Sequence, residues 1–104
     1  MTQFIVLIHG NARSVPSDEE WEEFVATAVA SRLFRGGSEI GERSVIGAQE
    51  LAGASQHIVG FMRFDSADRG AVVALLERHP VVLHGGSVEL CEMPRSSEGD
   101  DDPL

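Results

Sequence analysis

Residues 3–9 read QFIVLIH, a short β-branched and aromatic run from which the prediction of the fold starts. It is closed by a Gly-Asn pair, so it predicts a β-strand rather than a helix. The side chains alternate between two faces, with Phe4, Val6 and Ile8 on one and Ile5 and Leu7 on the other. Both faces are apolar, which is typical of a strand that is covered on two sides.

A helix is predicted after this strand and a short loop. Ser17 is placed to begin it, and Glu20 three residues later completes a capping box. The apolar residues near helical spacing form one stripe, namely Trp21, Phe24, Val25, Ala28 and Leu33. We expect Gly36 and Gly37 to end the helix, because glycine readily adopts the left-handed conformation of a helix C-terminus.

The rest of the chain continues as strand, strand, helix and strand. The predicted elements are a strand in residues 38–47, a polar loop over 49–56, a strand over 57–65, a helix capped by Ser66 and ended by Pro80, a lead-in over 81–86 and a strand over 87–93. Residues 1–94 are therefore expected to form one domain. Residues 95–104 are polar and acidic, and we expect a disordered tail there.

This order of elements predicts an α+β, ferredoxin-like βαββαβ fold. Two right-handed crossovers give a four-stranded antiparallel sheet of order 4-1-3-2 with both helices on one face. The opposite face of the first and third strands is apolar and has no cover within the chain. Burial of this face against a second copy is the simplest remedy, so we predict a homodimer.

The charge of the chain excludes some partners. The chain has 8 basic and 17 acidic residues, and residues 1–97 alone still carry 13 acids against 8 bases. Such a surface repels phosphate groups, which argues against nucleic acids and anionic membranes as partners. The single cysteine, Cys91, excludes an intrachain disulfide and is consistent with a cytoplasmic location. The first residues fit neither a signal peptide nor a membrane span.

Four stretches of the sequence carry a family resemblance. They are FIVLIHG, LFRGGSEIG, IVGFMRFDS and HPVVLHGGSVELCEMP, and together they cover most of residues 3–94. In these stretches the chain resembles the YCII-related (YciI-like, DGPF-type) domains of the dimeric α+β barrel superfamily. The last stretch, a proline-ended helix followed by two glycines and a Val-Glu-Leu strand, is the most specific.

The resemblance implies a dimer whose two sheets close into a barrel, with a pocket beside each sheet. Superfamily members include small isomerases and monooxygenases that use no metal ion. YciI-like members often carry a histidine late in the first helix, whereas this chain has none there and Arg32 lies in that region. The Asp-Gly-Pro-Phe sequence is also absent, and residues 48–51 are its equivalent.

The predicted topology gathers polar side chains at one rim of the sheet. We expect the first and third strands to be adjacent and parallel, so that their C-terminal ends meet beside the starts of the other two strands. A histidine beside a carboxylate can act as a general base, and an arginine can hold a substrate carboxylate. The predicted catalytic residues are His9 and Asp65, with Glu39 as an alternative carboxylate. The predicted substrate-binding residues are Arg13, Arg35, Glu39, Arg63 and His84.

Two functions remain open from the sequence. The first is a small-molecule-binding homodimer, with isomerase-like proton transfer as its catalytic form. The second is a dimeric interaction or regulatory module without chemistry, in which His9 is only the polar end of a strand and Asp65 begins a turn. His79 and His84 lack a helical HxxxH spacing or a cysteine partner, so we predict no metal site. We also predict no cofactor.

Overall fold

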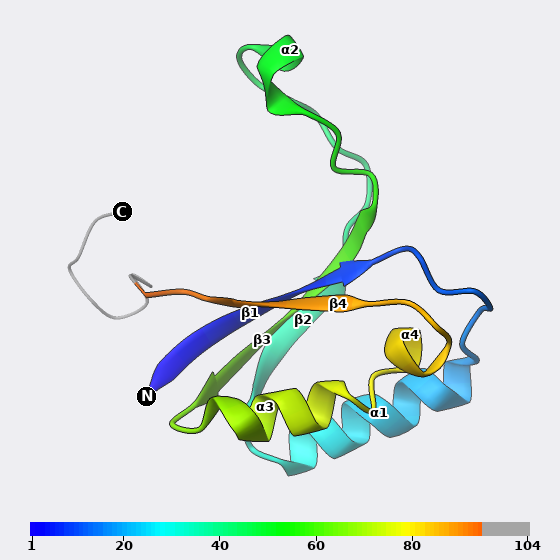
Figure 1. Cartoon of the computed structure of the whole chain (residues 1–104), viewed down its shortest axis with the longest axis vertical. Coiled ribbons are helices and arrows are strands. Elements are labelled where there is room, and N and C mark those ends of the chain that lie inside the picture. Colours follow the sequence, from blue (N-terminus) through cyan, green and yellow to red (C-terminus); the bar gives the residue numbers. More distant parts are fainter. Residues whose placement is uncertain (95–104) are drawn as a thin grey trace.

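The computed structural model describes residues 1–94, and the tail predicted at residues 95–104 lies outside them. Figure 1 shows a twisted sheet with helices gathered along one side of it. In chain order the elements are β1 Thr2–His9, α1 Asp18–Ala30, β2 Phe34–Glu39, α2 Gln49–Ala52, β3 Ile58–Ser66, α3 Arg69–Leu76, α4 Pro80–Leu83 and β4 Val88–Glu92.

The sheet has the order β2-β3-β1-β4, and each pair of neighbours is antiparallel. This confirms the predicted α+β class and the predicted strand order. The expectation that the first and third strands are parallel was wrong. Each helical crossover makes β2 run parallel to β1 and β4 parallel to β3, so β3, which lies between β1 and β2, runs opposite to both.

The core lies between the sheet and α1, α3 and α4. Its buried apolar side chains are Phe4, Val6, Ile8, Met62 and Phe64 from the sheet, and Phe24, Ala28, Val72, Leu76 and Val81 from the helices. A fully buried side chain of this size stabilises the fold by about 1.5–3 kcal/mol. These contacts hold α1, α3 and α4 against the sheet.

The boundaries of α1 follow the predicted start but not the predicted end. Ser17 and Glu20 form the capping box, which confirms the start of the helix. The helix ends at Ala30, because Arg32 adopts the left-handed conformation (φ 65°). Gly36 and Gly37 lie instead within β2, at a break in its register with β3. The second strand therefore begins and ends earlier than predicted, and residues 40–47 lie outside it.

The connection from β2 to β3 forms a long arm. Residues 40–57 project away from the sheet and carry α2 near their tip (Figure 1). Arg43 ties the two sides of the arm together by donating hydrogen bonds to the carbonyl oxygens of Ser55 and Ile58. Ile46 and Leu51 are 91% and 83% exposed, so the arm presents apolar side chains to its surroundings.

The segment between β3 and β4 differs from its predicted form in two respects. Asp68, not Ser66, caps α3, because its carboxylate accepts a hydrogen bond from the Gly70 N–H. Pro80 begins the short helix α4, so residues 81–86 are not an extended lead-in. The fixed φ of proline suits the first position of a helix, where no N–H donor is needed.

The face of the sheet without helices carries both apolar and charged side chains. Leu7 lies between Phe61 of β3 and Glu89 of β4, and Ile5 lies between Arg63 and Cys91. Apart from the exposed Glu89, these side chains are only partly buried. The open face is thus less uniformly apolar than its sequence pattern indicates.

Candidate functional site

A groove lies between α1 and the β2–β3 side of the sheet. It has a volume of about 840 Å³, within the usual range for small-molecule sites. Its apolar walls include Ile8, Trp21, Val25, Phe34, Met62 and Val81. Gly36 and Gly37 of β2 also line the groove, and they add no side chains to it.

Three carboxylates line the same groove. Asp18 and Glu22 are four residues apart on one face of α1, and Glu39 lies at the end of β2. All three are exposed, so they can make the mouth of the groove electronegative. Among residues 1–94, no three histidine, cysteine or carboxylate side chains are arranged to hold a metal ion.

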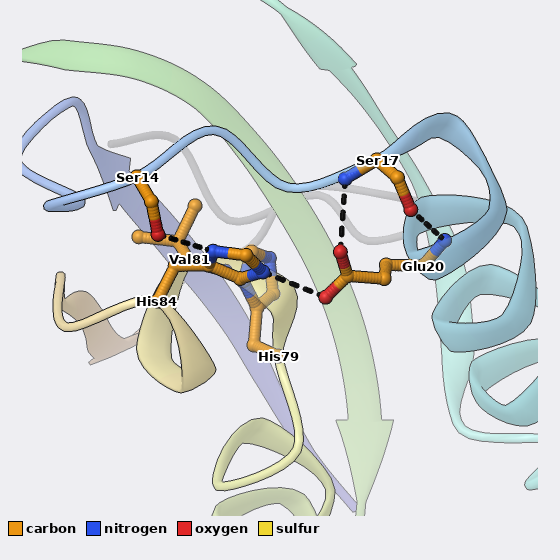
Figure 2. A network of polar contacts seen from close by, with 6 residues as sticks. All are labelled: Ser14, Ser17, Glu20, His79, Val81 and His84. Atoms are coloured by element: carbon orange, nitrogen blue, oxygen red, sulfur yellow. Dashed lines mark hydrogen bonds and ion pairs between the residues drawn. The ribbon is translucent and has the colours of Figure 1, made fainter.

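A second polar cluster lies near the start of α1, and Figure 2 shows it. The His84 ring contacts Ser14 Oγ through Nδ1 at 2.6 Å and Glu20 Oε2 through Nε2 at 2.7 Å. Glu20 Oε1 accepts a hydrogen bond from the Ser17 N–H at 3.0 Å, and Ser17 Oγ accepts one from the Glu20 N–H at 3.2 Å. Hydrogen bonds thus connect a serine to a histidine and the histidine to a glutamate.

The electrostatics of this cluster favour an ionised glutamate. The hydrogen bond from the Ser17 backbone lowers the pKa of Glu20, and the hydrogen bond from His84 lowers this pKa further. Both effects favour the charged form because the charged carboxylate is the better acceptor. Glu20 is therefore an acceptor for His84 at neutral pH.

His79 lies beneath this cluster and is completely buried. Its Nδ1 accepts a hydrogen bond from the Val81 N–H at 3.1 Å and so caps α4. Its ring makes edge contacts with Trp21 and Phe24 at centroid distances of 5.0 and 4.8 Å. Burial lowers the pKa of His79 from its usual 6.5 to about 4, so the ring is neutral at pH 7.

The structure separates the predicted catalytic pair. His9 lies opposite Ile58 and Asp65 opposite Gln3, so the two are about 20 Å apart along the strands. His9 Nε2 instead contacts Glu89 Oε1 at 3.0 Å, while Asp65 accepts a hydrogen bond from Arg35 Nε at 3.2 Å. The separation follows from the antiparallel pairing of β1 with β3.

The other predicted residues divide between the two ends of the sheet. Arg13 and His84 lie at the same end as His9, where the Arg13 N–H donates to the His84 carbonyl at 2.8 Å. Glu39 also lies at that end and lines the groove. Arg63 lies on the open face opposite Ile5, between the two ends.

Several residues of the groove and of the polar cluster were not predicted as site residues from the sequence. Ser14 lies in a predicted loop without a motif, and the spacing of Glu20 from Ser17 indicates only a helix cap. Asp18, Trp21 and Glu22 line the groove together with Val25, and they follow a helical i, i+3, i+4, i+7 spacing. That spacing places the four residues on one face of α1, and it is the sequence signal from which this wall of the groove could have been predicted.

No protein-family model matches the chain, and no curated protein matches it in sequence. Two solved structures are similar to it. One is 5-chloro-2-hydroxyhydroquinone dehydrochlorinase (TftG) from Burkholderia phenoliruptrix AC1100, in complex with 2,5-dihydroxybenzoquinone, with a TM-score of 0.48 and 8% identity over 95% of this chain and 99% of that chain. The other is At3g17210 from Arabidopsis thaliana, with a TM-score of 0.45 and 16% identity over 93% of this chain and 97% of that chain. Neither likeness assigns a ligand or a reaction to this chain.

Proposed function

We propose that this protein binds a small molecule with an aromatic or otherwise apolar body in the groove between α1 and β2–β3. The observation that carries the proposal is the groove itself, whose walls are mainly apolar and include Trp21. A ring that enters the groove can pack on Trp21 and remove apolar surface from water. Asp18, Glu22 and Glu39 favour a cationic or neutral ligand over an anionic one.

We also propose that the protein is a YCII-related homodimer of the dimeric α+β barrel type. The four sequence stretches and the strand order β2-β3-β1-β4 support this assignment. The open face of the sheet supplies part of the dimer contact through Ile5, Leu7 and Phe61. The exposed apolar side chains of the arm provide further surface for the second copy.

Trp21 makes the binding proposal directly testable, because it is the only tryptophan in the chain and it lines the groove. Three matched probes are benzylamine, benzyl alcohol and phenylacetate, which differ mainly in charge. We expect the fluorescence of Trp21 to change on titration with benzylamine and with benzyl alcohol. Phenylacetate should bind roughly tenfold more weakly than benzylamine, because the carboxylates repel it.

Two variants on the same helix locate the binding site. Val25→Trp fills the groove, whereas Val29→Trp places the same side chain four residues further along α1 and outside the groove lining. Ligand-observed NMR should show saturation transfer to benzylamine for the wild type and Val29→Trp, and none for Val25→Trp. Transfer that is absent from the wild type, or unchanged in Val25→Trp, contradicts the proposal.

The alternative, an interaction module without a ligand, predicts that none of the three probes binds in the groove. Isomerase-like proton transfer stays a prediction. The separation of His9 and Asp65, about 20 Å along the strands, gives the predicted pair no support. Of the predicted site residues, Glu39 lies in the groove lining and would be the group nearest to a bound ligand.

A further inference from the structure

We infer that Ser14 is a nucleophile, that His84 is its general base, and that the cluster cleaves small, uncharged or anionic esters by acyl transfer. This inference does not rest on ligand binding in the groove. Ser14 Oγ lies 2.6 Å from His84 Nδ1, and His84 Nε2 lies 2.7 Å from Glu20 Oε2. A nucleophile in contact with a base, which a third group orients, is the arrangement that nucleophilic catalysis requires.

The hydrogen-bond partners assign the protons in this cluster. An ionised carboxylate can only accept, so the contact with Glu20 places the ring proton of neutral His84 on Nε2. Nδ1 then carries a lone pair and must accept, so the Ser14 hydroxyl donates to it. The hydroxyl proton already points at the base that would remove it. The familiar serine hydrolase arrangement uses the two ring nitrogens in the opposite order, but either nitrogen can accept the proton.

The three groups are held by contacts that do not involve a substrate. The capping box fixes Glu20 through Ser17. His84 follows α4, where its N–H donates to the Pro80 carbonyl at 3.0 Å. The His84 side chain is only 20% exposed, whereas Ser14 is exposed and open to a substrate. A partly buried base beside an exposed hydroxyl suits attack on a molecule that arrives from solvent.

Arg13 directly precedes the nucleophile in the chain and carries a positive charge. Its side chain packs against Gly85, where an added Cβ atom would lie 3.1 Å from Arg13 Cδ. Among residues 1–94, no hydrogen bond or ion pair engages the Arg13 guanidinium group. This cation can stabilise the oxyanion that forms when Ser14 attacks a carbonyl carbon. It also favours an anionic acyl group over a cationic one.

The reaction balances with water as its second substrate. Ser14 Oγ forms a bond to the carbonyl carbon while its proton moves to His84 Nδ1. The ester C–O bond then breaks, and His84 returns the proton to the leaving alcohol. Water attacks the acyl-Ser14 intermediate with the same proton transfers, releasing the carboxylic acid and restoring Ser14. No oxidant, metal ion or cofactor is required.

Covalent labelling of the whole protein with a fluorophosphonate probe tests the inference, with peptide mass mapping to locate the adduct. We expect one adduct, on Ser14, that Ser14→Ala abolishes. Ser44→Ala is the matched control, because Ser44 is an exposed loop serine without a histidine contact, and this variant should label like the wild type. Wild-type protein that labels at Ser14 but does not bind benzylamine would contradict the groove proposal alone, so the two results are distinguishable.

The labelling rate distinguishes a catalytic base from a structural contact. His84→Asn should slow labelling by about 100-fold or more, since general base catalysis contributes on this scale. Glu20→Gln should preserve the site of labelling but slow it, because a neutral amide is a weaker acceptor for the His84 N–H. Glu20→Asp, which keeps the carboxylate, should restore part of the rate. Circular dichroism confirms that each variant is folded. An unlabelled Ser14 in the wild type, or an unchanged rate in a folded His84→Asn variant, overturns the inference.

Discussion

The completely buried His79 shows how one side chain ties acid stability to packing. Its ring fills the space between Trp21 and Phe24 while its Nδ1 caps α4. Protonation would place a charge in this apolar site, which is why its pKa falls to about 4. In the unfolded chain the same ring titrates near its usual 6.5.

We expect this difference to destabilise the protein in weak acid. Between pH 6.5 and about 4 the unfolded state binds a proton that the folded state does not, so the free energy of unfolding falls as the pH falls through this window. The loss should reach up to about 3 kcal/mol. Urea denaturation at a series of pH values measures it.

His79→Asn is the control for this prediction, because asparagine can also cap α4 but does not titrate in this range. The variant is expected to be less stable at pH 7, since a smaller side chain leaves a cavity beside Trp21. Its stability should depend less on pH between 6.5 and 4 than that of the wild type. Equal pH dependence in both proteins would show that His79 is not the responsible group.

Glu20 makes the stability of the same region depend on pH in a second way, through a group that is charged in the folded protein. Its pKa is lowered, first by the Ser17 backbone hydrogen bond and then by His84. The ionised carboxylate therefore stabilises the fold above its usual pKa of 4.5, and this contribution is lost as the pH falls through the lowered folded value. We expect wild type to be more stable than Glu20→Gln at pH 7, with the difference shrinking at pH 3. A constant difference would be inconsistent with this role.

At the scale of elements, the β2–β3 pairing depends on a glycine. A Cβ atom on Gly37 would lie 2.3 Å from the Phe61 carbonyl oxygen and 2.9 Å from Met62 Cα. Both are backbone atoms, so the strands must move apart to admit a side chain. At Gly41, four residues later, an added Cβ atom would meet no other atom within 4 Å.

We therefore expect Gly37→Ala to lower the free energy of unfolding by about 1–3 kcal/mol. Gly41→Ala should change it by less than about 0.5 kcal/mol. Chemical denaturation of the two variants beside the wild type measures both values. Similar effects at the two positions would mean that the close approach of β2 to β3 does not limit the strand.

The type of an element was predictable where the local signals agreed. The limits of an element were not predictable where those signals conflicted. The capping box of Ser17 and Glu20 correctly marked the start of α1. The Gly36-Gly37 pair predicted a helix end, but the strand uses these residues where β3 approaches closely. A single sequence does not distinguish these two uses of glycine, because both depend on what lies opposite the residue.

At the scale of the whole molecule, the open face of the sheet leads to a prediction about assembly. Leu7 lies at its centre between Phe61 and Glu89. In a symmetric dimer any substitution acts twice, and each buried leucine contributes about 1.5–3 kcal/mol. We expect the wild type to be a dimer at micromolar concentration and Leu7→Lys to raise its dissociation constant by about 100-fold or more.

Native mass spectrometry and light scattering after size exclusion measure this assembly. Val29→Lys is the matched control, because Val29 is 59% exposed on α1 and lies away from the open face. It should leave the dimer intact, and circular dichroism should show that both variants keep the fold. A wild-type monomer at micromolar concentration contradicts the dimer proposal.

The sequence was sufficient to predict the order of the four strands and the two longer helices, the sheet order and the acidic character of the chain. The element order follows from periodicity and capping residues, which are local features of the sequence. The sheet order follows from the general handedness of crossovers. Which side chains meet depends on the tertiary structure. Antiparallel pairing of β1 with β3 separates His9 from Asp65, and packing of α4 against α1 brings His84 to Ser14 and Glu20. Such contacts join residues far apart in the chain, so their geometry depends on strand direction and helix placement together.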